Sequence, residues 1–287
     1  MDLVYRLRSR RERFSPVEQK IVAAILDDVA YAASATIDAL AARAGVSKSA
    51  LSRFAKHVGC QDIRALRMEL AQAAAVGSRY LREAGPAPEA SRFFGNIVAD
   101  IEAALHRHLH AFDEARVSAA AKLMLDARLV QAFGMGGCSS LFAAELQQRL
   151  VRFGLPVSAC QDPVTMRVAS AALSAEDTVV MLSMTGVTPA MIDVAALLKQ
   201  YDCRIVALTP ADSPLAAHAD AILPILIDET DFIYKPTAAR YGMMLAVDLL
   251  ATEIALRRRP ASREALRRAK LALDAYRGGG DRLPLGD

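Results

Sequence analysis

Residues 35–59, with the sequence ATIDALAARAGVSKSALSRFAKHVG, predict two short helices joined by one tight turn. Thr36 is a typical N-cap, and the apolar residues after it recur at helical spacing. Gly45 is expected to end this helix, because glycine adopts the left-handed backbone conformation without steric cost. Ser47 can then cap a second helix that begins near Lys48. The segment therefore favours a helix-turn-helix.

The second helix is expected to have one apolar and one polar face. The residues that should pack inward are Val46, Ala50, Leu51, Phe54 and Val58. The polar residues, with the N-cap serine, are Ser47, Lys48, Ser49, Ser52, Arg53 and Lys56. In a helix-turn-helix such a face enters the major groove, where Arg can hold guanine through two hydrogen bonds and Lys and Ser anchor phosphates. The pattern favours double-stranded DNA as a partner; the alternative is an ordinary helical hairpin with a solvated basic face.

The distribution of charge favours the same interpretation. Residues 1–80 hold 13 Lys and Arg against 8 Asp and Glu, whereas the rest of the chain holds 22 against 24. The basic excess thus lies with the predicted helix-turn-helix, where neutralisation of phosphates requires it, although a solvated surface would also explain it. The cluster Arg6, Arg8, Arg10, Arg11 and Arg13 has two interpretations, a contact to the DNA backbone or a frayed basic end.

The whole chain is long enough for about two domains, and 53% of its 287 residues are hydrophobic. Its apolar runs are far shorter than the roughly 20 residues that cross a bilayer, and its first residues lack the apolar stretch of a signal peptide. We therefore expect a cytoplasmic protein with no membrane partner. Four scattered cysteines, at 60, 138, 160 and 203, predict reduced thiols and neither a zinc site nor a disulfide framework. No metal or cofactor is expected.

The N-terminal part is expected to be an all-α helix-turn-helix domain over residues 1–77. Ser15, Pro16 and Glu18 have the spacing of a capping box at a helix start, and Asp62 is placed to cap a further helix through about Val76. The segment that follows contains GPAPEA, whose prolines and glycine predict an interdomain linker over residues 78–90.

The C-terminal part, residues 91–277, has the alternation of an α/β fold. Helices near 91–111 and 114–126 precede β-rich segments at 129–133, 156–159, 178–183, 204–209 and 221–224, which helical segments separate. Such alternation predicts a parallel sheet with helices on both faces. Long helices at 240–259 and 262–277 are expected to offer a pairing surface, and residues 278–287, with three consecutive glycines, a flexible tail.

Two loops follow predicted strands and lead into helices, at the edge where parallel sheets bind ligands. The first reads GMGGCSS over 134–140 and the second SMTGVT over 183–188. Glycines let backbone amides approach an anion, and hydroxyls at a helix N-terminus add donors where the macrodipole favours negative charge. A dinucleotide fingerprint would need a glycine in place of Ser139 and an acidic residue about 20 positions later, which weakens a nucleotide interpretation. The pair favours a phosphate site; the alternative is two capped helix starts without a ligand.

These segments resemble a known family of proteins. FSPVEQKIVAAILDD, TIDALAARAGVSKSALSRFAKHVG and DIRALRMELAQA are similar to the helix-turn-helix domain of the RpiR family of bacterial transcriptional regulators. FGMGGCSS, Asp162-Pro163, SMTGVT and IVALTPADSPLAAHADAILPI resemble the SIS (sugar isomerase) domain that this family joins to it. The resemblance implies a homodimer or homotetramer that binds operator DNA and a phosphorylated sugar or sugar acid. The DETDFIY and ATEIALRR segments look closest to members that sense intermediates of hexose acid catabolism.

The resemblance also implies which residues bind the effector. They are Gly136, Ser139, Ser140, Ser183, Thr185, Gly186 and Thr188. Thr185 stands in place of the more usual serine and keeps the hydroxyl. Cys138 stands where the family commonly has serine, so either Ser139 takes the phosphate position through a local shift or that half of the cradle is weaker.

A sugar-phosphate isomerase of the SIS type is the alternative function, since SIS domains also occur in such enzymes. Proton transfer between sugar carbons needs a positioned general base, usually His or Glu. Three histidines, at 106, 108 and 110, are spaced about 200° apart on a helix and cannot share one face as metal ligands. His218, Glu145 and Glu229 could serve as bases, but ordinary helix and loop positions explain them as well. No catalytic constellation emerges, and we expect a transcriptional regulator rather than an enzyme.

Overall fold

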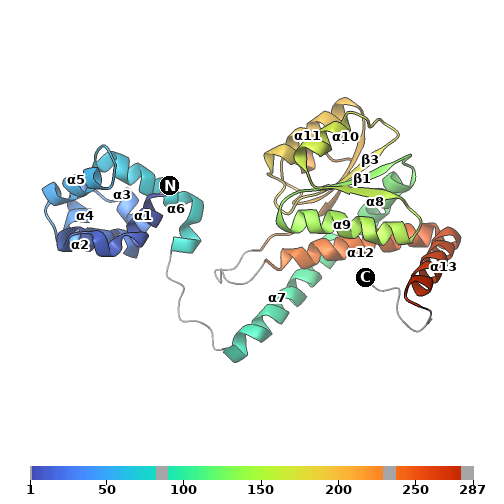
Figure 1. Cartoon of the computed structure of the whole chain (residues 1–287), viewed down its shortest axis with the longest axis horizontal. Helices are drawn as coiled ribbons and strands as arrows, with labels where there is room; N and C mark the ends of the chain where they lie inside the picture. The colour runs from blue at the N-terminus through green and yellow to red at the C-terminus, as the bar shows by residue number, and fades with distance from the viewer. Residues whose placement is uncertain (1, 82–89, 229–236, 279–287) are drawn as a thin grey trace. The chain divides into compact units, whose positions relative to one another are not determined.

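The computed structural model describes residues 2–81, 90–228 and 237–278. These residues form two compact units, one before and one after residues 82–89, and Figure 1 labels the helices and strands of each. Most of the expected linker, nearly all of the DETDFIY segment with Glu229, and nearly all of the expected tail lie outside the described residues. Each unit is described by itself.

The described part of the N-terminal unit is helical, as expected. Its elements are α1 (Leu3–Ser9), the short 3₁₀ helix η1 (Arg11–Arg13), α2 (Pro16–Asp27), α3 (Val29–Ser34), α4 (Ile37–Ala44), α5 (Lys48–His57) and α6 (Ile63–Leu81). The predicted helix starts are confirmed. Ser15 and Glu18 make both hydrogen bonds of a capping box, and Asp62 Oδ1 accepts from the backbone N–H of Arg64 and of Ala65 at 2.8 Å.

The basic stretch at the start of the chain is folded, so its interpretation as a frayed end is wrong. The side chain of Asp2 caps α1, and Leu3, Val4 and Leu7 are buried in the core of the unit. This apolar face consists of only three residues, and arginines lie between and after them in the sequence, so no helical repeat of apolar residues is evident. The core of the unit therefore includes a helix that the sequence pattern does not predict.

Helix α6 also differs from its prediction, because it runs to Leu81 rather than ending near Val76. Gly77 lies inside the helix, where a single glycine costs only about 1 kcal/mol relative to alanine. The residues that follow it, 78–81, are compatible with a helix. The first part of the expected linker is therefore helical.

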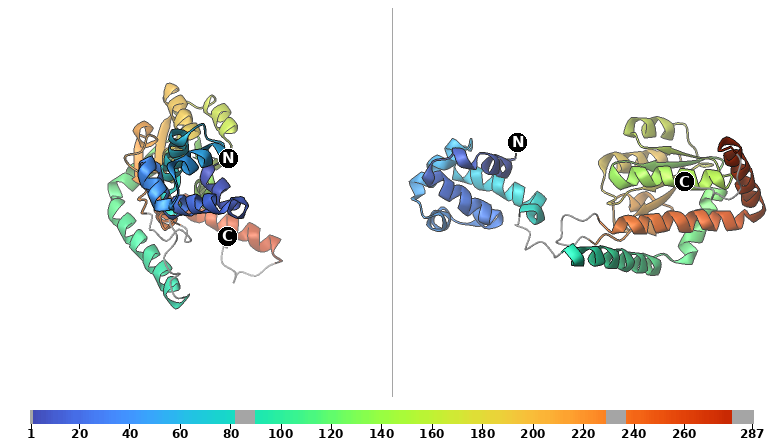
Figure 2. Two further views of the ribbon diagram at one scale, coloured as in Figure 1. Left: turned by 90° about the vertical axis from the view of Figure 1, so that its left-hand side faces the viewer. Right: turned by 60° about the horizontal axis from the view of Figure 1, so that its bottom comes forward.

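The C-terminal unit is a five-stranded parallel sheet between two layers of helices (Figures 1 and 2). Its strands, in the spatial order β2-β1-β3-β4-β5, are β1 (Val130–Gly134), β2 (Val157–Cys160), β3 (Thr178–Leu182), β4 (Arg204–Thr209) and β5 (Ala221–Pro224). Its helices are α7 (Ala90–Ala111), α8 (Glu114–Leu125), α9 (Gly137–Arg152), α10 (Pro163–Ser170), α11 (Pro189–Gln200), η2 (Ala216–His218), α12 (Ala239–Arg257) and α13 (Arg259–Tyr276). The predicted parallel sheet with helices on both faces is confirmed.

Strand β3 shows how the layers are held together. Val179 and Met181 pack with the layer of α10 and α11, whereas Val180 and Leu182 pack with α8, α9 and α12. All five residues of the strand are buried. Parallel strands covered on both faces have continuous apolar sequences for this reason, in contrast to the alternating pattern of half-exposed strands.

The two long C-terminal helices, both expected to offer a pairing surface, differ in burial. Helix α12 is largely a core helix, with eight buried residues, and it packs against α7, α8 and α9. Helix α13 has only Ser262 buried, and Leu271 and Tyr276 are 63% and 89% exposed. Of these two helices, α13 is thus the one that exposes more of its surface. Within the three described ranges, no helix has the length and apolar character needed to cross a membrane.

Candidate recognition helix and ligand site

The turn between α4 and α5 has the predicted geometry. Thr36 Oγ1 accepts from the backbone N–H of Ala39 at 3.2 Å and begins α4. Gly45 ends that helix with φ +62°, in the left-handed region. Ser47 Oγ then accepts from the backbone N–H of Ala50 at 3.2 Å and begins α5. A helix-turn-helix is therefore formed by the residues that predict it.

Helix α5 buries the face that its sequence indicates. Leu51 and Phe54 are fully buried, as is Ala55, which the sequence pattern does not single out. The other expected inward residues, Val46, Ala50 and Val58, are half-buried.

Some side chains on the polar face of α5 have hydrogen-bond or ion-pair partners within the unit, and others have no ion-pair partner among the described residues. Ser47 and Ser49 share a hydrogen bond of 2.9 Å between their hydroxyls, and Lys48 pairs with Asp38 of α4. Ser52 is half-buried. The two cations farther along the helix, Arg53 and Lys56, are exposed and make no ion pair within the described part of the chain. These two are the cations of the face that are free to meet a phosphate or a base edge.

The end of α5 is held by residues from distant helices. Arg6 of α1 donates from Nη1 to the backbone oxygen of Val58 at 2.9 Å. His57 Nδ1 lies 2.5 Å from Glu18 Oε1, the same carboxylate that caps α2. Burial would raise the pKa of Glu18, but hydrogen bonds with His57 and Ser15 outweigh it and hold that pKa below its ordinary value. Helix α5 is therefore fixed against α1 and α2 at its C-terminal end.

The two glycine and hydroxyl loops of the C-terminal unit lie side by side. They leave β1 and β3, which are neighbouring parallel strands, and Gly134 at the end of one pairs with Leu182 at the end of the other. The connections from these two strands run to opposite sides, since β1 is followed by β2 and β3 by β4. In open parallel sheets this reversal makes a crevice at the carboxyl ends of the strands, where ligands bind.

Two buried hydroxyls join the loops and shape them. Ser139 Oγ, in the first turn of α9, accepts from the backbone N–H of Met184 in the second loop at 3.2 Å. Ser183 Oγ accepts from the backbone N–H of Gly186 at 3.0 Å and closes the second loop on itself. Each oxygen accepts a hydrogen bond, so each hydroxyl hydrogen can be donated to an anion. Ser139, rather than Cys138, reaches the second loop; Cys138 packs against the core.

The other predicted effector residues lie on the same edge with smaller structural roles. Gly136, with φ +72°, is the N-cap residue of α9. Ser140 donates to the backbone oxygen of Gly137 at 3.0 Å. Thr185 is exposed, and its hydroxyl lies 3.5 Å from the backbone N–H of Val187. Thr188 is the N-cap residue of α11 but makes no capping hydrogen bond with its side chain. Its hydroxyl is therefore available to a ligand.

A third loop, which the sequence pattern does not assign to the site, packs against the second loop. Thr209 at the end of β4 and Ser213 share a hydrogen bond of 3.3 Å between hydroxyls, and both are buried. Gly186 lies directly on them, because a Cβ atom at position 186 would come within 2.2 Å of Ser213 Oγ and 2.5 Å of Thr209 Oγ1. The requirement for glycine at 186 is thus steric as well as conformational, since its φ is +65°.

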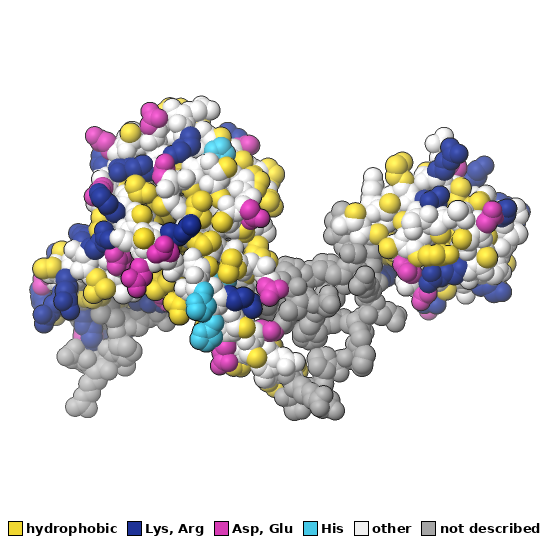
Figure 3. Space-filling view, turned by 180° about the vertical axis from the view of Figure 1, so that it is seen from behind, with side chains coloured by type: hydrophobic (Ala, Val, Ile, Leu, Met, Phe, Trp, Pro, Cys, Tyr) yellow, Lys and Arg dark blue, Asp and Glu magenta, His cyan; other side chains and the backbone are white. Residues whose placement is uncertain are grey.

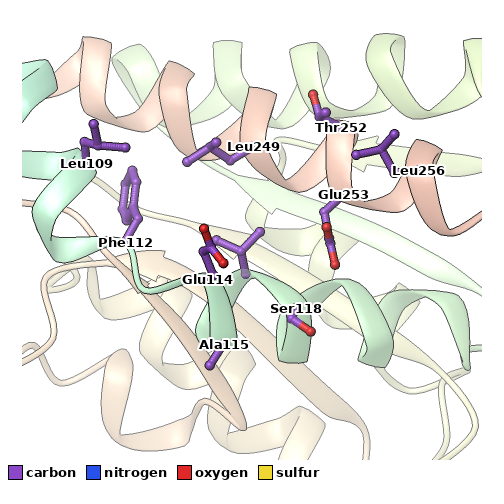
Figure 4. A pocket seen from close by; sticks show the side chains of 10 residues that line it. Leu109, Phe112, Glu114, Ala115, Ser118, Leu249, Thr252, Glu253 and Leu256 are labelled. Atoms are coloured by element: carbon purple, nitrogen blue, oxygen red, sulfur yellow. The ribbon is translucent and has the colours of Figure 1, made fainter.

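Two cavities of the C-terminal unit lie elsewhere and suit a phosphate less well. One of about 620 Å³ lies between α7, α8 and α12 and has apolar walls with the carboxylates of Glu114 and Glu253 among them (Figure 4). The other, of about 650 Å³, lies at the amino ends of the strands, where Arg128 is already paired with Asp177 at 2.8 Å. Carboxylates in both cavities would repel an anion.

Two of the three side chains considered as catalytic bases lie within the described residues. Glu145 of α9 is paired with Arg149 at 2.6 Å, and His218 is half-buried in η2. Glu229 lies outside the described residues. In the ranges that the structure covers, no group of three or more His, Cys, Asp or Glu residues could hold a metal ion.

Sequence comparison identifies related proteins for both units. Residues 1–77 match the family described as "Helix-turn-helix domain, rpiR family", and residues 123–253 match the SIS domain. The HTH-type transcriptional regulator HexR of Escherichia coli is 30% identical over 278 residues, covering 96% of both chains. HexR of Pseudomonas aeruginosa is 31% identical over 277 residues, covering 95% of both.

Structural comparison finds the same fold. The Vibrio vulnificus NanR protein, solved in complex with ManNAc-6P, matches with a TM-score of 0.60 and 21% identity, over 96% of this chain and 98% of that one. The sugar isomerase domain of an RpiR transcription factor from Sphaerobacter thermophilus matches with a TM-score of 0.56 and 22% identity, over 61% and 96% of the two chains. The chain is thus 30–31% identical to two regulators along nearly its whole length, and it matches both domain models in order. It belongs to the RpiR family of HTH-type transcriptional regulators, in which an SIS domain follows the helix-turn-helix.

Proposed function

We propose that this regulator controls carbohydrate or sugar-acid catabolism by binding operator DNA through α5 and a phosphorylated sugar or sugar acid at the β1/β3 edge of the SIS domain. The observation that carries the proposal is the meeting of the two loops, residues 134–140 and 183–188, at the point where the strand order of the sheet reverses. NanR, which shares the fold, was solved with a phosphorylated sugar. The effector binds one arrangement of the DNA-binding units better than another and so changes operator affinity.

The donors at this edge suit a phosphate without a permanent positive charge. Helices α9 and α11 both begin at this edge of the sheet, and backbone N–H groups at a helix N-terminus favour anions. Ser139 and Ser183 add hydroxyl hydrogens from fixed, buried positions. A phosphate held by fixed hydroxyls and amides would be distinguished from an unphosphorylated sugar, which lacks the charge that these donors complement.

Thr188→Val is expected to weaken effector binding by about tenfold or more, because hydrogen bonds to charged groups are worth about 1.5–3 kcal/mol. The change removes a hydroxyl that makes no capping bond, so the fold should be unaffected. Calorimetric titration with hexose 6-phosphates and 6-phosphohexonates measures the effect. Thr252→Val on α12 is the control, since Thr252 is exposed and distant in the chain from both loops. Equal affinity in the two variants would remove Thr188 from the site.

Lys56→Ala is expected to weaken binding to operator and to unrelated DNA by the same factor. An exposed lysine in this position anchors phosphate, and each lost phosphate contact lowers the slope of log affinity against log salt by about 1. Fluorescence anisotropy at several salt concentrations measures the slope. A loss confined to the operator sequence would instead assign Lys56 to a base edge.

The proposed assembly is a homodimer or homotetramer that recognises an operator with two-fold symmetry. Dimers of helix-turn-helix proteins bind half-sites separated by whole turns of about 10 base pairs. The exposed apolar residues of α13, Leu271 and Tyr276, are the candidates for the pairing surface. Light scattering of the intact chain, with and without Leu271→Asp, tests this assignment, because an unchanged mass would exclude α13.

We propose further that the protein is a regulator only. The relatives that match along the full length are named as transcriptional regulators. Solved structures described as sugar-phosphate isomerases share the fold at 16% identity and a TM-score of 0.52, a likeness that concerns the fold alone. Conversion of ketose phosphates to aldose phosphates by the purified protein at enzymatic rates would favour the isomerase function instead.

A further inference from the structure

Helix α7 carries a buried histidine that neither the DNA-binding face nor the effector loops use. His108 is 1% exposed, and both nitrogens of its ring are occupied. Nδ1 lies 2.7 Å from the backbone oxygen of Ala104, and Nε2 accepts from the backbone N–H of Leu226 at 2.9 Å. These partners require the neutral ring with its hydrogen on Nδ1. Burial, together with the charge of Arg107, outweighs the bond to Ala104 and lowers the pKa of His108, in agreement with a neutral ring.

The imidazole is enclosed by a third element. A Cβ atom at Gly242 of α12 would lie 2.2 Å from Nε2, so only glycine leaves room for the ring. Figure 2 shows α7 running along α12. A second, exposed contact accompanies the buried one, because Arg107 lies 3.4 Å from Asp228, two residues beyond Leu226. Helix α7 is thus joined by adjacent side chains to the segment that leaves β5.

That segment begins at the edge where the effector loops lie. Strand β5 is parallel to β4, so its carboxyl end is on the same edge. Gly186 of the second loop rests on Thr209, the backbone oxygen of Thr209 accepts from Ile225 at 3.0 Å, and the next residue is Leu226. A continuous series of contacts therefore leads from the second loop to His108.

Helix α7 is also the first element of the C-terminal unit, and residues 82–89 connect it to α6. We propose that His108 is a positioning residue whose hydrogen bond to Leu226 holds the segment after β5 against α7. This contact, called the fastening below, transmits the binding of an effector at the carboxyl edge of the sheet to α7, the helix that follows residues 82–89. The inference rests on the proposed function, because it explains how a bound phosphorylated sugar changes operator affinity.

Two neutral substitutions separate the hydrogen bonds of His108. In His108→Gln the side-chain amide reaches the position of Nε2, where its oxygen can accept from Leu226. In His108→Asn the shorter amide keeps a donor near Nδ1 for Ala104 but does not reach Leu226. The two variants thus differ in whether the side chain at position 108 can accept the hydrogen bond from Leu226. His106→Asn is the matched control, because His106 is exposed on the same helix, where Figure 3 shows histidine side chains at the surface.

The functional measurement is the ratio of operator Kd with and without a hexose 6-phosphate or 6-phosphohexonate that binds the wild type. Ratios of about 5–150 are typical of allosteric coupling. We expect His108→Asn to bring the ratio of operator Kd values close to one. In His108→Gln the logarithm of the ratio should be at least half of the wild-type value, and in His106→Asn the ratio should be unchanged. Effector affinity and effector-free operator affinity should change by less than about threefold in all three, because His108 touches neither ligand.

The structural measurement needs no effector. Hydrogen exchange of the Leu226 amide should be slow in the wild type and in His108→Gln, and at least tenfold faster in His108→Asn. Gly242→Ala tests the same fastening from the opposite side, because the added methyl group would displace the ring. Alanine ordinarily stabilises a helix relative to glycine, so loss of Leu226 protection in this variant would identify displacement of His108 as the cause.

Two results would overturn the inference. One is an unchanged rate of Leu226 exchange in His108→Asn, which would show that the ring does not hold the segment. The other is a wild-type ratio of operator affinities in His108→Asn despite rapid exchange, which would show that the fastening does not carry the signal. Absence of any phosphorylated sugar binding in the wild type is a different failure, that of the proposed function, and the exchange measurement would still test the fastening.

Discussion

Gly186→Ala is expected to lower the free energy of unfolding of the C-terminal unit by about 2–5 kcal/mol, since a left-handed backbone costs a side chain about 1–2 kcal/mol and overpacking a further 1–3. The glycine has φ +65°, and an added Cβ would lie 2.2 Å from Ser213 Oγ. The loop at residues 183–188 must then move away from the buried pair of Thr209 and Ser213. Urea denaturation followed by circular dichroism measures the stability. Effector affinity should fall in the same variant.

Gly45→Ala separates the two causes. Gly45 has nearly the same φ, +62°, but an added Cβ would meet no atom within 4 Å. Its substitution should therefore carry only the conformational part, about 1–2 kcal/mol, in the N-terminal unit. An effect of Gly186→Ala no larger than that of Gly45→Ala would mean that the loop relaxes freely, and that the contact with Ser213 does not hold it.

Arg53→Ala is expected to reduce operator affinity by about 1–3 kcal/mol, or roughly 5- to 150-fold, because an arginine that holds guanine through two hydrogen bonds is worth that much discrimination. Arg53 is exposed on α5 and forms no ion pair within the described residues, so its removal breaks no ion pair among them. The loss should be concentrated on the operator, with unrelated DNA affected far less. Effector binding should be unchanged, because Arg53 lies in the other unit.

Arg263→Ala is the control for net charge. Arg263 is exposed on α13, so its removal changes the charge of the chain equally without touching α5. Competition experiments with operator and scrambled DNA at one salt concentration give the specificity ratio for each variant. Equal losses on both DNAs in Arg53→Ala would assign Arg53 to phosphate, and an unchanged affinity would remove it from the interface.

Much of this fold is predictable from the sequence because its signals are local. Helix caps such as Thr36, Ser47 and Asp62 act on backbone groups two or three residues away. Strands such as β3 are apolar throughout because helices cover both faces. The spacing of these signals is enough to predict the helix-turn-helix, the parallel sheet and the two loops at its edge.

The features of the fold that the sequence does not predict are contacts between residues far apart in the chain. Arg6 and Val58 are 52 positions apart, and His108 and Leu226 are 118 apart. No local periodicity marks such a pair, since each partner has an ordinary neighbourhood of its own. His108 is the clearest case, because its sequence context places it on a helix with two other histidines, and its contacts with Gly242 and Leu226 become visible only in the folded unit.

The candidate ligand site was predictable in composition but not in geometry. Sequence places Ser139 beside Cys138 and leaves open which of them faces the ligand. The structure places the Ser139 hydroxyl against the backbone of the second loop, because α9 begins at Gly137 and its first turn turns that side chain inward. The supporting pair of Thr209 and Ser213 could be suspected only as hydroxyls after a strand, a signal that many loops share.

The polar face of α5 has a consequence for how such regulators diversify. Ser52, Arg53 and Lys56 contribute no buried apolar side chain, and the helix is held instead by Leu51, Phe54 and the distant contacts at its C-terminal end. The residues that we propose for operator recognition and the residues that support the fold are thus different residues of one short helix. The outward positions can therefore be exchanged for those of a relative, and operator preference transplanted, with little change in the stability of the unit.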